Sequence, residues 1–306
     1  MSQTGTLMHN TNLRKEIGHI CQGRRHAPEK NQDFATSGRS SNGSFDYLVV
    51  ADGHDASGGN DVNKYLSELN WKSLLENPNF MDIIYNGVED LGNTSGQGST
   101  LTIVIITQMQ AEIYWIGDSQ VRIYKNLEEI WKSNNHDFNN HDELNRLNED
   151  PYIGNNSLET WRPKTSITTK PSWRTKLLSQ TEITMEQSNY FVFGLNDTIN
   201  MTHCLGHNSL TGRFWNEAVI DFADHMDYKI VAGSDGLWDM LHYKDYPFMA
   251  SRNIGVNEIL QLANDRWSQE WSYFCPKKPS NQTPIKQRFP NGQEDDISIA
   301  VWYRGI

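Results

Sequence analysis

The sequence predicts an α+β protein built as a layered sandwich of helices and mostly antiparallel strands. Short runs of β-branched and aromatic residues recur along the chain, and each is bounded by Gly, Asp, Asn or Ser, which is typical of strands. Amphipathic helical patterns lie between these runs without strict alternation, and some connections are short enough for hairpins. This mixture favours an α+β sandwich over a doubly wound parallel sheet.

The expected strands follow one another with short reversals between some of them. The segment "TQMQAE" is short enough for an antiparallel hairpin, and "IGDSQ", between Ile116 and Val121, makes a second tight reversal. The runs themselves are residues 45–51, 101–107, 111–116, 121–125, 189–193, 228–232 and 297–303.

Three segments have the period of a helix. Residues 61–77 place an apolar stripe on one face at three-and-four spacing, and residues 141–150 and 256–271 are further amphipathic candidates. Residues 134–156, rich in Asn and His, and residues 275–294, with four prolines, cannot supply a core, so we expect surface loops there. We expect one domain over residues 17–306, preceded by a tail of residues 1–16.

The bulk composition is that of a globular protein with an acidic balance. The chain has 306 residues and a net charge of −11, so it has no global positive field to attract nucleic acid or an acidic membrane. Its longest apolar run is only as long as a strand, and the first ten residues lack the apolar core of a secretory signal. Cys21, Cys204 and Cys275 form no disulfide framework and indicate a reducing compartment. We therefore expect an intracellular, cytoplasmic monomer that binds neither nucleic acid nor membrane; a nuclear location stays open.

Aspartates recur where the expected strands begin or end. An ionised carboxylate at the end of a buried strand is costly unless a cation compensates it, and no matching set of Lys or Arg stands beside these acids. Several acids that converge without basic partners suit Mg²⁺ or Mn²⁺, which prefer oxygen ligands. A single Asp-Gly is better explained as a turn, so only the whole series of acids indicates a metal site. The series is Asp33 in "KNQDFA", Asp52 in "VVADGH", Asp118 in "WIGDSQ", Asp235 in "AGSDGLWD", and Asp295 and Asp296 in "GQEDDISIAVW".

The order of these motifs resembles the type 2C protein phosphatases, a metal-dependent Ser/Thr phosphatase family. The resemblance spans about residues 17 to 303, and "SDGLWD" and "VVADGH" are its most specific parts. In chain order the segments read "GRRHAPEKNQD", "VVADGHD", "GQGSTLTIVII", "WIGDSQVRIY", "NNHDFNNHDELNRL", "MTHCLGH", "VAGSDGLWDML" and "EDDISIAVW".

The resemblance implies a four-layer α-β-β-α sandwich with two central, mostly antiparallel sheets. It also implies a centre of two Mg²⁺ or Mn²⁺ ions at one end of the sandwich, with a weaker third site. Carried over position by position, the implied ligands are Asp52, which bridges both ions, the Gly53 carbonyl, Asp235, Asp295, Asp118 at the third site, and Gln32 where the family has a glutamate.

The implied reaction is the hydrolysis of phosphoserine and phosphothreonine in proteins. A hydroxide that bridges the two metals would attack phosphorus in line, Asp33 would hold metal-bound waters, and His54 would be the general acid. For His54 the plainer alternative is a histidine that only hydrogen-bonds its turn. His136, His203 and His207 are interpreted as structural, because no ligand spacing links them.

Two departures from the family pattern concern the metal and the phosphate. Gln32 replaces a glutamate, so the second ion would lose a charged ligand. Pro28 stands where the family has the arginine that grips substrate phosphate. Arg25, or Arg24, would take that role if the following loop is three residues longer; the alternative is an ordinary solvated basic pair.

Two further departures lie beside the motifs. Asp55 replaces a glycine after His54, and we expect its charge to raise the pKa of His54 by favouring the protonated form. Gln120 replaces an arginine, a change that should affect scaffold contacts more than chemistry.

A basic segment, residues 158–182, interrupts this acidic chain. It falls where the family has a flap beside the active site, so we expect it to recruit phosphorylated or acidic substrate. A solvated loop explains it equally well. Its basic residues are Arg162, Lys164, Lys170, Arg174 and Lys176.

The leading hypothesis is therefore a Mg²⁺- or Mn²⁺-dependent protein Ser/Thr phosphatase whose partner is a phosphorylated protein. The runner-up is a pseudophosphatase, a protein-binding module of the same fold, for which Gln32 and the displaced arginine argue. A phosphatase acting on a small phosphorylated metabolite is a third, remoter hypothesis.

Overall fold

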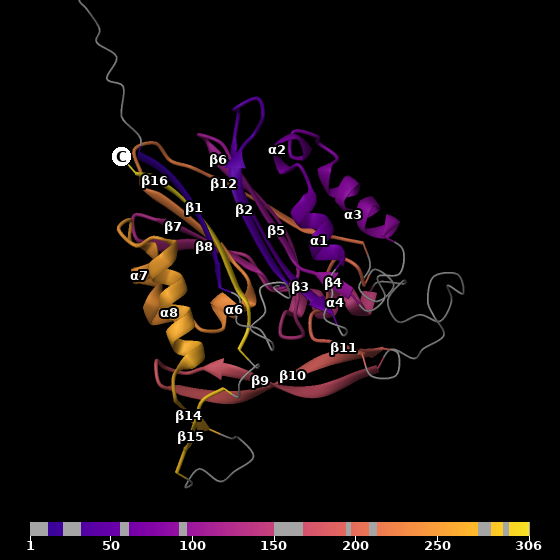
Figure 1. Cartoon of the computed structure of the whole chain (residues 1–306), viewed down its shortest axis with the longest axis vertical. Coiled ribbons are helices and arrows are strands. Elements are labelled where there is room, and N and C mark those ends of the chain that lie inside the picture. Colours follow the sequence, from indigo (N-terminus) through magenta and orange to yellow (C-terminus); the bar gives the residue numbers. More distant parts are fainter. Residues whose placement is uncertain are drawn as a thin grey trace, which may run out of the picture.

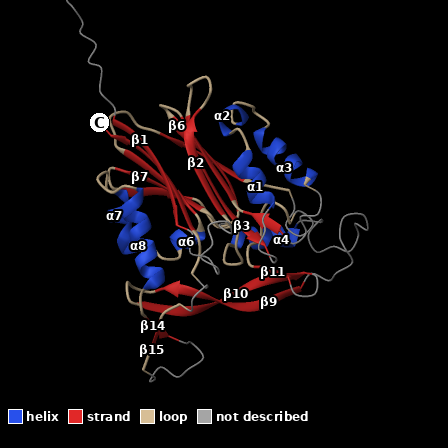
Figure 2. Ribbon diagram, in the orientation of Figure 1, coloured by secondary structure: helices blue, strands red, loops and turns tan. Residues whose placement is uncertain are grey.

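The chain forms a four-layer α-β-β-α sandwich, as the sequence and the family resemblance predict. Two antiparallel sheets face each other and helices cover their outer faces (Figures 1 and 2). The computed structural model describes residues 12–20, 32–55, 61–91, 97–149, 168–193, 197–207, 213–274, 283–289 and 294–305.

One central sheet has its strands in the order β1-β16-β13-β7-β8. β16 and β13 lie inside it and are covered on both faces, so each reads as a continuous apolar run rather than an alternation. The edge strand β1 begins at Asn12, inside the segment 1–16 that was expected to be a tail. Leu13 and Ile17 of this strand are exposed, and an edge strand with one open face gives a weak apolar pattern. The strands are β1 (Asn12–Ile20), β16 (Ile297–Gly305), β13 (Tyr228–Gly233), β7 (Gln120–Lys125) and β8 (Glu128–Lys132).

The other central sheet has the order β12-β6-β5-β3-β2, and the short β4 pairs with the end of β3. Side chains of β3 alternate between two cores: Leu48 and Val50 face the opposite sheet, whereas Tyr47 and Val49 face the helices. Both sets are buried, which explains the uninterrupted apolar run before Asp52. The strands are β12 (Asn216–Asp221), β6 (Gln110–Ile116), β5 (Leu101–Ile106), β3 (Asp46–Asp55), β2 (Asp33–Arg39) and β4 (Gln97–Ser99).

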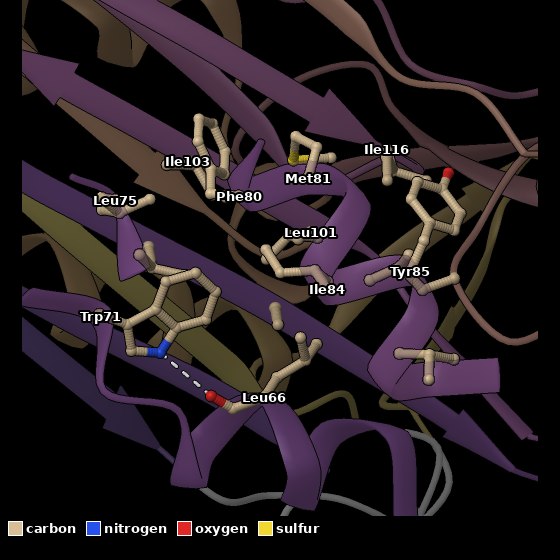
Figure 3. Close-up of a cluster of buried hydrophobic side chains, with 14 of the residues drawn as sticks. Leu66, Trp71, Leu75, Phe80, Met81, Ile84, Tyr85, Leu101, Ile103 and Ile116 are labelled. Atoms are coloured by element: carbon tan, nitrogen blue, oxygen red, sulfur yellow. Dashed lines mark hydrogen bonds between the residues drawn. The ribbon is translucent and has the colours of Figure 1, made fainter. Parts of the chain in front are cut away.

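Helices α1 (Asp61–Glu68), α2 (Trp71–Leu74) and α3 (Phe80–Asp90) cover the outer face of this second sheet (Figure 3). The sequence predicted one helix over residues 61–77, but the chain breaks between α1 and α2. The indole of Trp71 turns into the core and donates to the Leu66 carbonyl at 3.0 Å (Figure 3). In a continuous helix this carbonyl would instead accept from the backbone N–H four residues later.

Four elements that follow β13 pack against the first sheet. They are α6 (Asp235–Trp238), the short 3₁₀ helix η2 (Tyr243–Asp245), α7 (Tyr246–Ala250) and α8 (Val256–Ser268). The predicted helix at residues 256–271 is thus confirmed as α8, with an end three residues earlier. No helix in the described ranges is long and apolar enough to cross a membrane.

A third sheet lies across one end of the sandwich, below β3 and α6 in Figure 1. Its main part is a long antiparallel hairpin of β9 and β10, which includes residues 168–182 of the basic segment 158–182. Residues 158–167 lie outside the described residues. The strands are β9 (Thr168–Leu177), β10 (Glu182–Phe193), β11 (Asp197–Ile199), β14 (Trp271–Phe274) and β15 (Ile285–Gln287).

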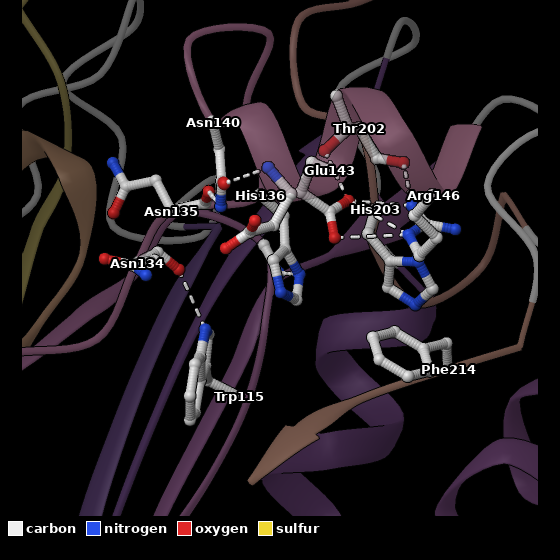
Figure 4. A network of polar contacts seen from close by, with 12 residues as sticks. Trp115, Asn134, Asn135, His136, Asn140, Glu143, Arg146, Thr202, His203 and Phe214 are labelled. Atoms are coloured by element: carbon white, nitrogen blue, oxygen red, sulfur yellow. Dashed lines mark hydrogen bonds and ion pairs between the residues drawn. The ribbon is translucent and has the colours of Figure 1, made fainter. Parts of the chain in front are cut away.

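Two segments expected to be surface loops contain regular structure. Within residues 134–156, His136 is fully buried and α4 (His141–Glu149) forms as the helical period predicted, so the loop interpretation was wrong there. Polar side chains can be buried in this segment because they bond to one another (Figure 4). The described part of residues 275–294 includes β15, which is exposed and pairs with β14.

Candidate metal centre

The ends of β2 and β3 bring two carboxylates together. Asp33, the first residue of β2, lies opposite Asp52 in β3. Thr100 holds the backbone of Asp52 on both sides: its hydroxyl accepts from the Asp52 N–H at 2.9 Å, and its own N–H donates to the Asp52 carbonyl at 2.8 Å. The two acids therefore come from adjacent strands at one end of the second sheet.

The first sheet contributes two more carboxylates at the same end. Ser234, just after β13, exchanges hydrogen bonds with Ser298 of β16 at 2.9 and 3.0 Å, which brings Asp235 next to the residues before β16. A Cβ at Gly236 would overlap the Asp296 carbonyl, so only glycine allows this close approach. Asp295 consequently lies beside Asp235.

Burial and mutual repulsion raise the pKa values of these carboxyls. Burial, with the charges of Asp296 and Asp235, raises the pKa of Asp33 to about 7. The pKa of Asp52 is well above its usual value because of burial and the charges of Asp33, Asp235 and Asp295. Desolvation by the surrounding protein and the charge of Asp235 also raise the pKa of Asp295. Part of the Asp295 residue is nevertheless exposed to solvent. The four predicted acids thus form one electrostatic cluster.

A second group of acids adjoins this cluster and includes a cation. Burial and Asp235 raise the pKa of Asp118 to about 7, and Asp239 behaves likewise. The guanidinium of Arg174, from β9, lies 3.5 Å from Asp118 Oδ2 and 3.6 Å from Asp137 Oδ2. Burial alone would lower the pKa of Arg174, but the neighbouring carboxylates raise it above its usual range. The sequence analysis did not predict that Asp137, Asp239 and Arg174 belong to the site. The signal was present for the two acids, because Asp137 lies in the motif segment "NNHDFNNHDELNRL" and Asp239 is the last residue of "SDGLWD".

Gln32 and Gly53 lie side by side at the edge of the cluster. The Gly53 N–H donates to the Gln32 carbonyl at 2.9 Å, and Asn63 Nδ2 donates to the same oxygen. The Gln32 N–H donates to Asp296 Oδ2 at 3.3 Å. Gln32 Nε2 is buried and has no hydrogen-bond partner in the described part of the chain. Gln32 is therefore placed next to the carboxylates, as its sequence position predicted.

His54 follows Gly53 and lies partly buried beside a second histidine. Its ring stacks on that of His207, with centroids 5.1 Å apart. Burial and His207 lower the pKa of His54 to about 3. The pKa of His54 is therefore below its ordinary value because burial, and then an imidazole that the sequence did not place here, disfavour the protonated form; the effect of Asp55 stays a prediction. The side chain of Asp55 lies outside the described parts of the structure, as do Arg25 and Arg24.

Gln120 has the scaffold role that was expected of it. Its Nε2 donates to Asn135 Oδ1 at 2.7 Å, and its Oε1 accepts from Arg122 Nη2 at 2.9 Å. The side chain therefore ties the start of β7 to the segment before α4.

The donor set fits hard divalent cations. The clustered groups offer carboxylate and carbonyl oxygens, and burial together with mutual repulsion raises the pKa values of these carboxyls, an unfavourable situation that a bound cation would relieve. Asp235 Oδ1 is buried and has no hydrogen-bond partner among the described residues. Mg²⁺ and Mn²⁺ are the ions that such oxygen ligands prefer.

Known proteins share both the sequence pattern and the fold. The family model described as protein phosphatase 2C matches residues 15–156, which carry Asp33, Asp52 and Asp118. The matched part is thus similar in sequence to the protein phosphatase 2C family. No curated protein matches the chain.

Solved structures of type 2C phosphatases resemble nearly the whole chain. The serine-threonine phosphatase 2C from Toxoplasma gondii gives a TM-score of 0.59 at 13% identity, covering 95% of each chain. The catalytic domain of the phosphatase PstP, in complex with two manganese ions, gives 0.50 at 14% identity, covering 97% of this chain and 100% of that one. A C. elegans sex-determining protein gives 0.55 at 14% identity, and the match covers 95% of this chain but 64% of that longer one. The chain therefore has the type 2C phosphatase fold.

Proposed function

We propose that this chain hydrolyses phosphoserine and phosphothreonine in proteins and depends on two divalent cations, Mg²⁺ or Mn²⁺, with a weaker third. The observation that carries the proposal is the convergence of four aspartates from separate elements of both sheets. The family match over the first half of the chain and the type 2C fold support it. The four aspartates are Asp33, Asp52, Asp235 and Asp295.

The metal ligands would be those that the resemblance implies. Bound there, the two ions would supply a nucleophilic water near neutral pH and neutralise charge on the phosphoryl oxygens. Asp33 would orient water by accepting its hydrogen bonds. The ligand residues would be Asp52, the Gly53 carbonyl, Gln32, Asp235 and Asp295, with Asp118 and Asp235 at the weaker site.

His54 is the proton donor in this proposal. It lies one residue past Gly53, so its ring can face a phosphoryl group held at the carboxylate cluster. In the metal-free site its lowered pKa keeps the ring neutral. The negative charge of a bound phosphate would favour the protonated ring, which can then give its proton to the leaving seryl or threonyl oxygen.

The β9–β10 hairpin would supply the positive charge that recruits substrate. Arg174 lies at the cluster itself, whereas Lys176, two residues along β9, is exposed and pairs with Glu186 at 3.1 Å. A guanidinium at the metal centre can also contact phosphate oxygens with two parallel hydrogen bonds. Arg25 remains a further candidate for this role.

Hydrolysis of a phosphothreonine peptide tests the proposal. We expect turnover that requires Mn²⁺, stops on chelation, and is lost in Asp235→Ala. Asp221→Ala is the matched control, because Asp221 lies exposed on the edge strand β12, outside the cluster. A folded protein without turnover at millimolar Mn²⁺ would contradict the proposal.

A binding module of the same fold is the second candidate. The neutral Gln32 among the ligands and the low pKa of His54 favour it, since both weaken catalysis more than they weaken recognition. Such a module would bind phosphorylated partners through the basic hairpin and would show one weak Mn²⁺-binding event without turnover.

A further inference from the structure

The segment 201–207 is fixed beside the candidate metal centre, although none of its residues is a ligand in the proposal above. The Thr202 N–H donates to the His136 carbonyl at 2.7 Å, and the Thr202 hydroxyl donates to Glu143 Oε2, also at 2.7 Å. Arg146 Nη2 donates to the Thr202 carbonyl at 3.1 Å. Figure 4 shows this network, which joins α4 to the start of the segment. The residues that follow Thr202 therefore leave from an anchored point.

Further along, the segment pairs with β4 and meets the end of β3. Leu205 and Ser99 exchange both backbone hydrogen bonds, at 2.9 and 3.0 Å. In β4, Gly98 lies opposite His54 of β3, and at this point the His54 and His207 rings stack with an angle of 14° between their planes. A Cβ at Gly98 would overlap His54 Nε2 and lie 2.6 Å from His207 Cδ2. Glycine at this position leaves the space that the two imidazoles occupy.

A buried thiol completes the group. Cys204 is fully buried. One potential ligand atom from each of His54, Cys204 and His207 lies within 4.8 Å of the other two. In a tetrahedral zinc site, with Zn–N of about 2.0–2.1 Å and Zn–S of about 2.3 Å, the ligand atoms lie roughly 3.3–3.6 Å apart. The atoms of the three side chains are therefore at most roughly 1.2–1.5 Å further apart than the ligand atoms of such a site.

We propose that His54, Cys204 and His207 form a second metal site, for one borderline-soft transition-metal ion such as Zn²⁺. Imidazole nitrogen and thiolate sulfur select Zn²⁺, whereas the neighbouring carboxylates select Mg²⁺ or Mn²⁺, so the two sites differ in the ion that each prefers. Because the thiolate is the ligand, binding releases the thiol proton of Cys204. Three protein ligands leave a fourth position for water.

The site shares His54 with the reaction, and this consequence rests on the proposed function. A Zn²⁺ ion on His54 would occupy the ring lone pair that must take up a proton, so the imidazolium that donates the proton in the proposal could not form. Zinc at this site therefore inhibits hydrolysis while the carboxylate cluster keeps its own ions.

Cobalt spectroscopy on the full chain tests the site without any assay of turnover. Co²⁺ is a spectroscopic substitute for Zn²⁺: bound to a thiolate it shows a sulfur-to-cobalt charge-transfer band, which Co²⁺ on carboxylates lacks. Excess Mg²⁺ occupies the carboxylate cluster during the titration. We expect the band to saturate at one equivalent of Co²⁺ in the wild type, and to be unchanged in Cys21→Ser and Cys275→Ser, the matched thiol controls.

Variants of the site should change the band selectively. Cys204→Ser should abolish it, and His207→Ala should weaken Co²⁺ binding at least by the roughly 10- to 100-fold that loss of an outer-shell partner causes. Circular dichroism establishes that each variant folds, and Cys204→Ala replaces Cys204→Ser if the hydroxyl prevents folding. Asp235→Ala should keep the band, which separates this site from the carboxylate cluster and from the proposed function. A folded wild type without the band, or a band that survives both Cys204 variants, would overturn the proposal.

The inhibitory consequence has its own measurement. With Mg²⁺ in excess, one equivalent of Zn²⁺ should reduce wild-type turnover several-fold, and the fractional loss should be much smaller in Cys204→Ser. Equal fractional loss in the two proteins would contradict the inhibitory role, while the cobalt band would still report on the site itself.

Discussion

The guanidinium of Arg174 lies 3.5 Å from the Asp118 carboxylate, so a basic strand outside the sandwich makes an ion pair with the acidic cluster inside it. Asp137 shares the same guanidinium at 3.6 Å. β9, which carries Arg174, belongs to the third sheet, and the carboxylates belong to the ends of the central sheets. The contact therefore connects a surface that can recruit substrate with the place where we expect hydrolysis.

Replacing Arg174 should weaken substrate binding more than it slows the hydrolytic step. In Arg174→Ala we expect KM for a phosphothreonine peptide to rise roughly 10-fold, the scale of one charge-assisted hydrogen bond in a partly exposed site. Lys176→Ala is the control, because Lys176 is exposed and pairs with Glu186 away from the cluster. Steady-state kinetics of both variants decide the point; an unchanged KM in Arg174→Ala would assign the arginine a purely structural role.

Removing the charge of Asp235 should stabilise the metal-free protein but abolish its binding of Mn²⁺. Asp235 raises the pKa values of Asp33, Asp52, Asp118 and Asp295, so Asp235→Asn relieves repulsion in the metal-free protein. We expect the metal-free melting temperature to rise by a few °C, at about 2–4 °C per kcal/mol. The increase that Mn²⁺ causes in the wild type should disappear. Thermal melts with and without Mn²⁺ measure both effects. If Mn²⁺ still raises the melting temperature of the variant, Asp235 is not a metal ligand.

Restoring a charge at Gln32 should strengthen metal binding. In Gln32→Glu we expect the half-saturating Mn²⁺ concentration for turnover to fall about 10-fold, because a unit charge about 4 Å from another contributes ~1–4 kcal/mol at effective dielectric constants of 80 to 20. Gln108→Glu adds the same charge in the exposed turn after β5, at the opposite end of that strand from the cluster, and should leave the requirement unchanged. If both variants behave alike, net charge rather than ligation explains the result.

The proton-donor role of His54 predicts a dependence on the leaving group. In His54→Gln, turnover of a phosphothreonine peptide should fall by roughly 10²- to 10⁴-fold, the usual contribution of general acid catalysis. Hydrolysis of p-nitrophenyl phosphate should fall much less, because p-nitrophenolate leaves without a proton. Parallel assays on the two substrates give the ratio, and an equal loss on both would argue for a positioning role instead.

The raised carboxyl pKa values predict how pH affects the metal-free protein. Asp33 and Asp118 have folded pKa values of about 7 against an ordinary value of 3.8, so the folded chain holds protons that the unfolded chain has already lost. Their contribution to stability is complete below about pH 4 and is lost as the pH rises through 7. Divalent ions bind the ionised form, so the Mn²⁺-induced rise in melting temperature should be larger at about pH 8 than at about pH 5.5. If the Mn²⁺-induced rise in the melting temperature of the wild type did not depend on pH, this linkage would be contradicted.

Sequence patterns found the strands with continuous apolar runs and missed several elements with weaker patterns. β5 and β13 are buried throughout, as are residues 46–51 of β3 and all of β16 except Arg304, and their apolar runs were plain. β12 alternates half-buried and exposed residues on a sheet edge, and β9 carries a proline and several cations because it lies outside the sandwich. α3 has a clear apolar stripe at helical spacing, including Ile84 and Val88, but no helix was predicted there from the sequence.

The aspartates of the candidate centre could be predicted because each stands in a motif of its own at a strand end. Arg174 and His207 could not be placed in the same way. Arg174 reaches Asp118 only because the hairpin crosses the end of the sandwich, and His207 reaches His54 only through the pairing of its segment with β4. Such contacts depend on tertiary arrangement between segments far apart in the chain, which local spacing does not encode.

Calorimetric titration of the metal-free protein with Mn²⁺, followed by turnover of a phosphothreonine peptide in the same samples, tests the central claim most directly. The convergence of acidic oxygens from both sheets predicts two binding events in the wild type, turnover that appears as the second event saturates, and the loss of both in Asp235→Ala. A wild type that binds no Mn²⁺, or that binds two ions and hydrolyses nothing, would contradict the account.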